Sequence, residues 1–349
     1  MLKVIIGAVF CILLIFMSAI VFFPGDNENR FNWKMNFTKD SNNTFTVTNV
    51  TYNSKTGESF GIGMYNAPLH NPEDSMHFSK CIENNEPFEG YYFISNQMYE
   101  QNDYLISCFL DYEQVPFSLD GSGPELLHRV YLAPFEEKFF RFDLGRLEPG
   151  GHDCEIVALL ETENHSLDLQ FRRSTDFSYL GSRRVNVYAN STELPVINYS
   201  SPSRIFAQNC GDGYVINDGL LLTRTPCVAE GWFTEDVRAG ETLVYYVNVA
   251  SDSKYPVSVA LVALLDYTQV PLLENDTSNA IFLNLAAGEK ISFPAYVQVP
   301  ATPGVHELMV LYFPVPYTML ESSPGESVKI DQWTCTEPSI RIGLNVSEA

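Results

Sequence analysis

The sequence predicts an all-β protein in which two tandem β-sandwich domains follow an N-terminal transmembrane helix. Three observations support this. A seven-residue segment occurs twice, strand-like patterns dominate the chain after residue 30, and the N-terminus carries a long run without charges. The length of 349 residues suits two domains of about 150 residues each.

The N-terminal element is the run at residues 4–23, which contains no charged residue. A helix of about 20 apolar residues spans the ~30 Å hydrocarbon core of a bilayer. No small-x-small cleavage site precedes Pro24. We therefore predict an uncleaved signal-anchor within residues 1–30, with Lys3 inside and the following domains outside the cell. A cleaved signal peptide, and hence a secreted protein, is the alternative.

The internal repeat sets the domain organisation. The segment LDYEQVP at 110–116 recurs as LDYTQVP at 265–271, with six identities in seven positions. The likeness continues downstream at a nearly constant offset, from PGGH to PGVH and from the segment at 185–190 to that at 340–345. We predict a first domain at 31–192, a linker at 193–204 and a second domain at 205–349.

The strands of each copy follow from hydrophobic patterning. Residues 105–110 and 257–265 are apolar almost without interruption, which is typical of a central strand covered on both faces. Val-Pro then turns the chain away, because proline donates no ladder hydrogen bond and holds the preceding residue extended. Pro-Gly-x-His marks a tight turn before further apolar strands at 154–160 and 308–313. Strands at such short intervals indicate a sandwich rather than βαβ units.

Six cysteines lie after the apolar run, and an even number in an exported protein suggests disulfides: Cys81, Cys108, Cys154, Cys210, Cys227 and Cys335. In the second copy, Ala263 and Leu308 stand at the positions of Cys108 and Cys154. This joint replacement predicts a disulfide between those two cysteines. Three pairings of the other four remain open, including Cys210–Cys227 together with Cys81–Cys335.

Each copy resembles the immunoglobulin-like repeats of the CARDB type in exported prokaryotic surface proteins. The shared features are a long apolar strand that ends near an acidic residue, a turn at 135–138 or 287–290, and Pro-Gly-x-His before the next strand. The resemblance covers about residues 90–190 and 241–345 and leaves the Asp-Tyr-x-Gln-Val-Pro segment unassigned. It implies an immunoglobulin-like fold and a non-catalytic module for adhesion, spacing or binding.

The net charge limits the kinds of partner that the protein can bind. The chain has 43 acidic and 21 basic residues, a formal net charge of −22, which disfavours nucleic acids and anionic lipid surfaces. Four basic residues are bunched: Arg172, Arg173, Arg183 and Arg184. Paired arginines grip carboxylates or sulfated glycans bidentately, so these residues form a candidate patch for an anionic partner. The alternative is that they neutralise local acidic residues.

The residues common to both copies are assigned structural roles: Asp111, Tyr112, Gln114, Pro116, His152, Asp266, Tyr267, Gln269, Pro271 and His306. An Asp that caps a turn, a Tyr hydroxyl that ties down a sandwich corner and a turn His that bonds local backbone account for most of them. His70 and His77, which bracket Glu73 and Asp74, are a weaker candidate for a metal site.

No catalytic signature accompanies these residues. The sequence lacks a Gly-x-Ser-x-Gly elbow, a His-Glu-x-x-His motif and a phosphate-binding glycine loop. We therefore expect no catalytic, cofactor-binding or metal-binding residue, and no cofactor. The expected function is that of a membrane-anchored, non-catalytic binding, adhesion or spacer protein of the cell envelope, acting on an envelope protein or a glycan. The alternative is an exported hydrolase or a metal-binding accessory subunit.

Overall fold

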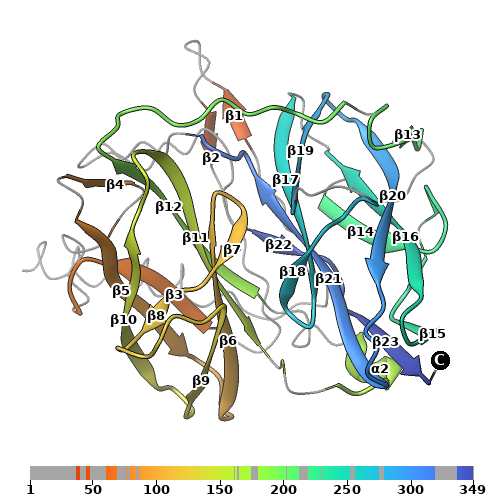
Figure 1. The fold of residues 1–349 in the computed structure, drawn as a ribbon, viewed down its shortest axis with the longest axis horizontal. Helices are drawn as coiled ribbons and strands as arrows, with labels where there is room; N and C mark the ends of the chain where they lie inside the picture. Colours follow the sequence, from red (N-terminus) through yellow and green to blue (C-terminus); the bar gives the residue numbers. More distant parts are fainter. Residues whose placement is uncertain are drawn as a thin grey trace, which may run out of the picture.

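The computed structural model describes residues 37–39, 45–47, 60–68, 76, 79–83, 86–160, 162, 165–173, 180–201, 203–211, 219–228, 230–251, 256–274, 279–318 and 336–348. Within these ranges the chain is built from β-strands and one short helix, α2 (Leu169–Arg172) (Figure 1). The all-β prediction is confirmed at this level. No helix among the described residues is long and apolar enough to cross a membrane, and the predicted span at 4–23 lies outside them.

The N-terminal sandwich, as we call the sheets within residues 60–189, has two layers. Its outer sheet has the order β3 (Phe60–Tyr65), β5 (Pro87–Asn96), β10 (Glu137–Arg146), β8 (Ser118–Leu119). Its inner sheet has the order β4 (Ser79–Ile82), β12 (Leu180–Ala189), β11 (Gly150–Leu160), β6 (Asn102–Leu110), β7 (Glu113–Val115), with β9 (Leu127–Leu132) also paired to β6.

The C-terminal sandwich, within residues 208–347, follows the same plan. Its outer sheet has the order β13 (Gln208–Asn209), β20 (Lys290–Gln298), β16 (Thr242–Ala250), β14 (Gly219–Thr223). Its inner sheet has the order β15 (Thr234–Arg238), β23 (Ile342–Ser347), β21 (Gly304–Pro314), β17 (Val257–Leu265), β18 (Thr268–Val270); β19 (Ala280–Leu285) also pairs with β17, and β22 (Glu337–Pro338) with β21. The strands β1 (Phe37–Lys39) and β2 (Phe45–Val47) form a separate pair.

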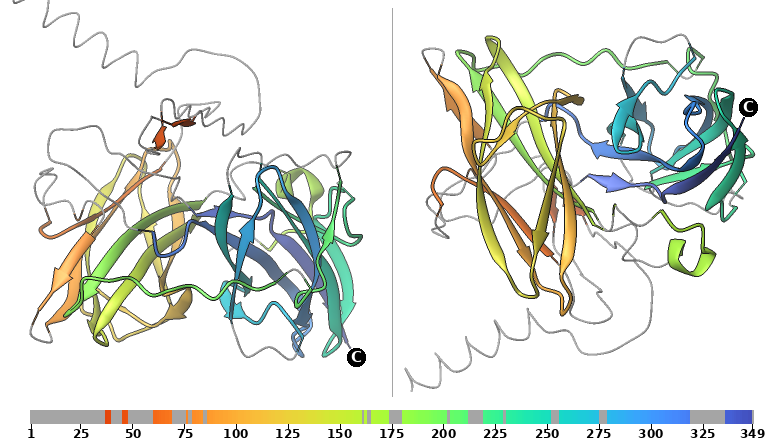
Figure 2. Two further views of the ribbon diagram at one scale, coloured as in Figure 1. Left: turned by 90° about the horizontal axis from the view of Figure 1, so that it is seen from above. Right: turned by 60° about the horizontal axis from the view of Figure 1, so that its bottom comes forward.

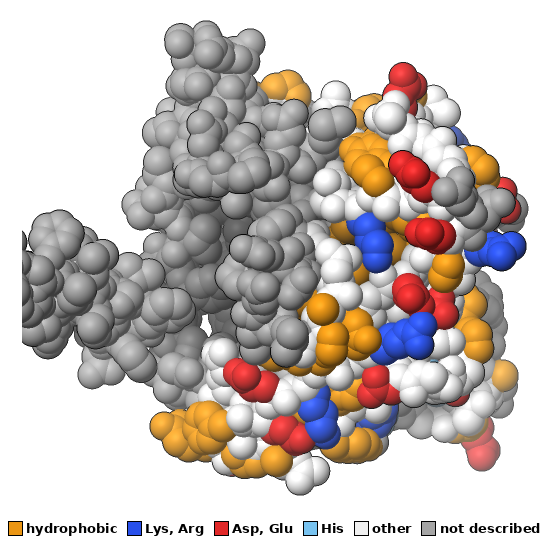
Figure 3. Space-filling view, turned by 90° about the vertical axis from the view of Figure 1, so that its left-hand side faces the viewer, with side chains coloured by type: hydrophobic (Ala, Val, Ile, Leu, Met, Phe, Trp, Pro, Cys, Tyr) orange, Lys and Arg blue, Asp and Glu red, His pale blue; other side chains and the backbone are white. Residues whose placement is uncertain are grey.

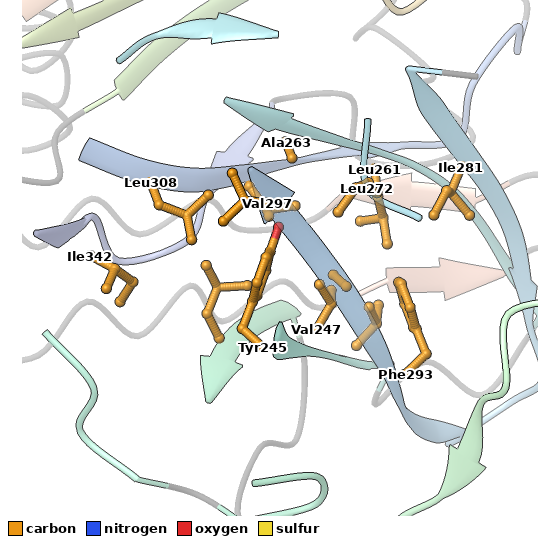
Figure 4. Close-up of a cluster of buried hydrophobic side chains, with 14 of the residues drawn as sticks. Tyr245, Val247, Leu261, Ala263, Leu272, Ile281, Phe293, Val297, Leu308 and Ile342 are labelled. Atoms are coloured by element: carbon orange, nitrogen blue, oxygen red, sulfur yellow. The ribbon is translucent and has the colours of Figure 1, made fainter. Parts of the chain in front are cut away.

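Each sandwich has its own apolar core between its two sheets. In the C-terminal sandwich, Tyr245, Val247 and Phe293 of the outer sheet are fully buried facing Leu261 and Leu308 of the inner sheet (Figure 4). Alternation along each strand sends every second side chain into this core. The two cores are therefore separate.

The central inner strands are buried on both faces, which confirms the prediction from their uninterrupted apolar sequence. On β17, Val259, Leu261 and Ala263 enter the core of their own sandwich. The alternate residues Ala260 and Val262 enter a third cluster, shared with the N-terminal sandwich. The outward face of each inner sheet is thus covered by the other sandwich. The two sandwiches lie side by side (Figure 2).

The structure corrects the alignment of the last strand of the repeat. His152 on β11 faces Val187 on β12, whereas His306 on β21 faces Leu344 on β23. Val187 therefore corresponds to Leu344, two residues later than the sequence alignment predicts. A shift of two residues leaves the inward and outward faces unchanged, so periodicity alone does not reveal the error.

Candidate functional site at the interface of the sandwiches

The shared segment Asp-Tyr-x-Gln-Val-Pro forms a tight hairpin turn in each sandwich. Leu110 pairs with Glu113 across the first turn. Asp111 and Tyr112 between them have φ values of +54° and +67°; Asp266 and Tyr267 repeat this with +48° and +65°. Positive φ at both central residues is the requirement of a two-residue type I′ turn, in which Asn-Gly is usual. A tyrosine in this conformation is strained, so its surroundings must stabilise it.

The aspartate of each turn is held by the shared histidine. Asp111 accepts the backbone N–H of Asp153 at 3.0 Å and contacts Nδ1 of His152 at 2.6 Å. Nε2 of His152 lies 2.8 Å from the carbonyl of Glu148. The second sandwich repeats all three contacts with Asp266, Glu307, His306 and Thr302. Since both ring nitrogens face acceptors, each histidine is best satisfied as the imidazolium.

The tyrosine of each turn enters the boundary between the sandwiches. Tyr112 is buried and packs edge-on against Phe313 of the other sandwich, with ring centroids 5.3 Å apart. Its hydroxyl donates to Asp153 at 2.5 Å. Phe313 also meets Phe109, at 5.4 Å. The apolar part of the boundary comprises Leu105, Phe109, Tyr112, Val157, Leu159, Ala260, Val262, Leu264, Tyr267, Ala280, Met309, Leu311 and Phe313.

The two shared glutamines link the turns reciprocally. The backbone N–H of Gln114 donates to Oε1 of Gln269 at 2.5 Å, and the N–H of Gln269 donates to Oε1 of Gln114 at 2.8 Å. Nε2 of Gln114 donates to the carbonyl of Tyr267, while Nε2 of Gln269 donates to that of Tyr112. The four bonds are related by an approximate twofold exchange of the two sandwiches, like a self-complementary dimer interface. This exchange explains why the glutamine is present in both copies.

A buried carboxylate beside the first turn collects donors from both sandwiches. Asp153 accepts from Tyr112, from Nη2 of Arg184 at 2.6 Å, from Asn186 and from the backbone N–H of Tyr317 at 2.5 Å. The Asp153 and Arg184 side chains are each only 2% exposed. A buried carboxylate is tolerated when its charge is paired and its lone pairs are occupied.

Two arginines cross the boundary in equivalent ways. Arg184 of β12 donates to the carbonyls of Pro314 and Val315, each at 2.9 Å. Arg341, its counterpart in the corrected alignment, donates to the carbonyl of Leu160 and contacts the hydroxyl of Tyr267. Pro314 and Leu160 are themselves equivalent, as the last residues of β21 and β11. Each sandwich therefore places one arginine on the end of the other's central strand.

The second carboxylate, Glu307, is neutralised by the connection between β11 and β12, which carries α2 over to the C-terminal sandwich (Figure 1). Arg172 at the end of α2 binds it bidentately, at 3.0 and 2.8 Å, and both side chains are fully buried. Gly343 makes this possible, because a Cβ there would collide with the Arg172 guanidinium. The equivalent residue in the N-terminal sandwich is Asn186, which binds Asp153 instead. The two halves of the interface thus satisfy equivalent carboxylates by different means.

Two of the four arginines predicted to form a patch for an anionic partner are therefore internal. Arg172 and Arg184 are 1% and 3% exposed and serve the boundary between the sandwiches. Arg173 is exposed and lies over the ring of Phe233 at 5.2 Å, and Arg183 is half-buried on β12. The two buried arginines pair with Glu307 and Asp153, which are distant in sequence. Their pairing could not be read from neighbouring residues along the chain.

The remaining shared residues have local roles. Pro116 and Pro271 are exposed and directly follow the short strands β7 and β18, where proline ends the ladder. Sequence reasoning missed Asp153, Glu307 and Arg341. A signal was present for the two acids, since each directly follows the shared histidine.

The structure contains one disulfide within its described residues, Cys210–Cys227. Cys108 and Cys154 are fully buried on neighbouring strands, with their sulfur atoms 3.8 Å apart and without a bond. Cys81 is a free, exposed thiol, and Cys335 lies outside the described residues. The predicted proximity of Cys108 and Cys154 is thus present, and the bond itself stays a prediction.

We expect oxidised protein to yield a Cys108–Cys154 peptide in mapping under non-reducing conditions. In a chain-entropy model, a loop of this size stabilises the folded state by about 3–4 kcal/mol. A Cys108→Ala, Cys154→Leu variant reproduces the residues of the second sandwich and serves as the unbridged control. Recovery of either cysteine alkylated as a free thiol contradicts the pairing.

Mild acid should stabilise this interface. Hydrogen bonding to Asp111 raises the pKa of His152, and burial raises the pKa of Glu155, which contacts Thr336, to about 7. Both groups hold a proton more tightly when folded. Their contribution to the free energy of unfolding is therefore present at low pH and is lost as the pH rises. For Glu155 the loss occurs between about pH 4.5 and 7, and for His152 from about pH 6.5 upwards.

Thermal unfolding between pH 5 and 9 tests this pH dependence. A Glu155→Gln variant should lose the pH dependence between about 4.5 and 7. A His152→Gln variant should lose only part of the dependence above about 6.5, because His306 makes the same contacts in the C-terminal sandwich and its pKa is also raised. A melting temperature that rises with pH between 5 and 7 contradicts the assignment.

Among the described residues, no group of three or more His, Cys, Asp or Glu side chains is arranged to hold a metal ion. His70, His77, Glu73 and Asp74 lie outside the described ranges.

Comparison with known proteins yields no family. No protein-family model matches the chain, and no curated protein matches it. Among solved structures it is similar to a CARDB domain from Pyrococcus furiosus, solved in complex with di-metal ions, at 15% identity and a TM-score of 0.22, over 37% of this chain and 88% of that domain.

It is also similar to the periplasmic chaperone SfaE, at 9% identity and a TM-score of 0.21 over 83% of this chain and all of the other. The chain is also similar to a red sea bream transglutaminase, at 11% sequence identity and a TM-score of 0.21. This similarity covers 84% of the present chain and 31% of that enzyme. Scores this low carry no argument about function. By its own strand order and burial, the chain is an all-β protein of two β-sandwiches joined through a shared buried interface.

Proposed function

We propose that the chain is a membrane-anchored, extracytoplasmic and non-catalytic protein of the cell envelope, in which two immunoglobulin-like domains act as one rigid binding or spacing unit. The proposed parts are a signal-anchor at 1–30, a first domain at 31–192, a linker at 193–204 and a second domain at 205–349. The proposed partners are the membrane, through the N-terminal segment, and an envelope protein or glycan.

One observation carries the proposal: the histidine, tyrosine and glutamine side chains shared by both copies make structural contacts within the protein. Each shared histidine has both nitrogens engaged, by an aspartate and by a carbonyl. A general base needs a free lone pair directed at a substrate proton. The shared tyrosines and glutamines lie between the sandwiches. These positions support a structural role for the repeated motif.

The disulfide and the charge support an extracytoplasmic location. Disulfides persist in oxidising compartments and are rare in the cytosol. Cys210 and Cys227 are bonded in the C-terminal sandwich. The strongly acidic composition suits an exposed, soluble outer portion and disfavours binding to phosphate-rich surfaces.

Membrane topology tests the proposal. The full chain should remain in the membrane fraction after a carbonate wash, and protease added to intact cells should degrade the sandwiches. A variant lacking residues 2–23 is the matched control and should be lost from the membrane. A soluble mature protein that starts near residue 24–30 contradicts the anchor, and protection from external protease contradicts the outward location.

A further inference from the structure

Two aromatic side chains protrude from one end of the N-terminal sandwich. Tyr99, between β5 and β6, is 70% exposed, and Phe135, between β9 and β10, is 58% exposed. Their rings meet edge to face with centroids 5.1 Å apart. Figure 3 shows apolar side chains at the lower end of the side of the molecule that carries the N-terminal sandwich. We call Tyr99 and Phe135 the aromatic tip.

Phe135 occupies a backbone position that suits glycine. Its φ is +58°, in a turn closed by a bond from the N–H of Ala133 to the carboxylate of Glu136 at 2.7 Å. The same turn in the C-terminal sandwich has the equivalent bond, from Ala286 to Glu289, and carries Gly288 with φ +69°. A bulky residue in the left-handed region is strained, and such strain concentrates at functional sites. The stability of the turn therefore does not explain why Phe135 stands where the other sandwich has a glycine.

The two loops of the aromatic tip are fixed to each other by a buried amide. Asn96 is fully buried, and its Nδ2 donates to the carbonyls of Glu100 at 2.8 Å and Ala133 at 3.0 Å. Its Oδ1 accepts from the N–H of Met98 and from the hydroxyl of Tyr104. The aromatic rings are thus carried on a preorganised support, which lowers the entropic cost of binding.

We propose that the aromatic tip docks into the interfacial zone of a zwitterionic bilayer. The two rings protrude from the ends of two loops. Protruding side chains can insert between lipid headgroups without a preformed pocket. One ring carries a hydroxyl, and amphipathic aromatic residues favour the level of the lipid headgroups. Glu100 and Glu137 flank the rings, while Glu136 is paired with Lys138 at 2.9 Å, so the charge around the tip is net negative. An anionic lipid surface would therefore be repelled, while phosphatidylcholine would not.

This inference rests on the proposed function, because two rings bind a bilayer weakly. A tether at residues 4–23 would hold the sandwiches close to the membrane and raise the local concentration of lipid surface. Docking by the aromatic tip would then set the orientation of the rigid pair on the membrane. A protein partner with an apolar pocket is the competing occupant.

Tryptophan scanning in lipid tests the proposal. The full chain is reconstituted in vesicles of phosphatidylcholine with and without its dibromostearoyl analogue, which quenches indole fluorescence by contact. The variant Phe135→Trp adds one indole at the tip. Phe206→Trp is the matched control, since Phe206 is 79% exposed and also has a positive φ, +53°, but lies on the C-terminal side.

The fluorescence added at position 135 should fall by at least about twofold in brominated lipid, as expected for an indole at headgroup depth, while that at 206 should not change. Replacing a third of the lipid by phosphatidylserine should weaken the quenching at 135. Equal, unquenched signals at both positions overturn lipid as the occupant, as does stronger quenching on phosphatidylserine. If the chain still resists the carbonate wash, the inference alone has failed and the proposed function stands.

Discussion

Replacing Glu307 by leucine should lower the free energy of unfolding by about 3–5 kcal/mol, because it leaves the Arg172 charge buried without its partner. Both side chains are fully buried, and Arg172 comes from the connection between β11 and β12, far from Glu307 in sequence. The loss should therefore be larger than for an exposed ion pair such as Arg141 with Glu89, because water screens the attraction between exposed charges. Denaturant unfolding measures it.

The double variant Arg172→Met, Glu307→Leu is the informative companion to that experiment. Removing both charges should restore most of the stability, since buried ion pairs are often replaceable by apolar residues. The exposed neighbour Arg173→Met is the matched control and should change stability by less than about 0.5 kcal/mol. If the double variant is as unstable as Glu307→Leu, packing rather than charge pairing governs this part of the interface.

The second large effect is expected at Phe313, and Phe313→Ala should cost about 3–5 kcal/mol. This side chain is fully buried between the sandwiches and contacts the rings of Phe109 and Tyr112. Truncation leaves a cavity that two rigid sheets cannot close. Phe206→Ala, at a 79% exposed position, is the control. A loss below about 1 kcal/mol for Phe313→Ala would show that the sandwiches barely depend on their contact.

The fold was largely predictable because its determinants are local. The apolar runs at 105–110 and 257–265 correspond to β6 and β17. The Pro-Gly-x-His segments, predicted as turns, belong to the following strands from their glycine onwards, since β11 begins at Gly150 and β21 at Gly304. Burial of both faces of the central strands also followed from their composition. Hydrophobicity shows that a face is covered and does not show by what, so the contact between the two sandwiches was not predicted.

The site was less predictable because its partners are far apart in sequence. Arg172 and Arg184 appeared as a surface patch, since nothing in their neighbourhood indicates Glu307 or an interface. The reciprocal bonds of Gln114 and Gln269 require knowing that the two turns meet. The aromatic tip was missed for another reason: Phe135 is conspicuous only once its positive φ and the equivalent Gly288 are seen.

Calorimetric unfolding of the full chain tests most directly whether the repeat makes one body of two sandwiches. A shared interface containing two buried carboxylates and a continuous apolar cluster should make them unfold together. The account predicts one main transition, with the calorimetric and van't Hoff enthalpies about equal, that moves as a whole in Glu307→Leu. Two separate transitions, of which the variant moves only one, would contradict it.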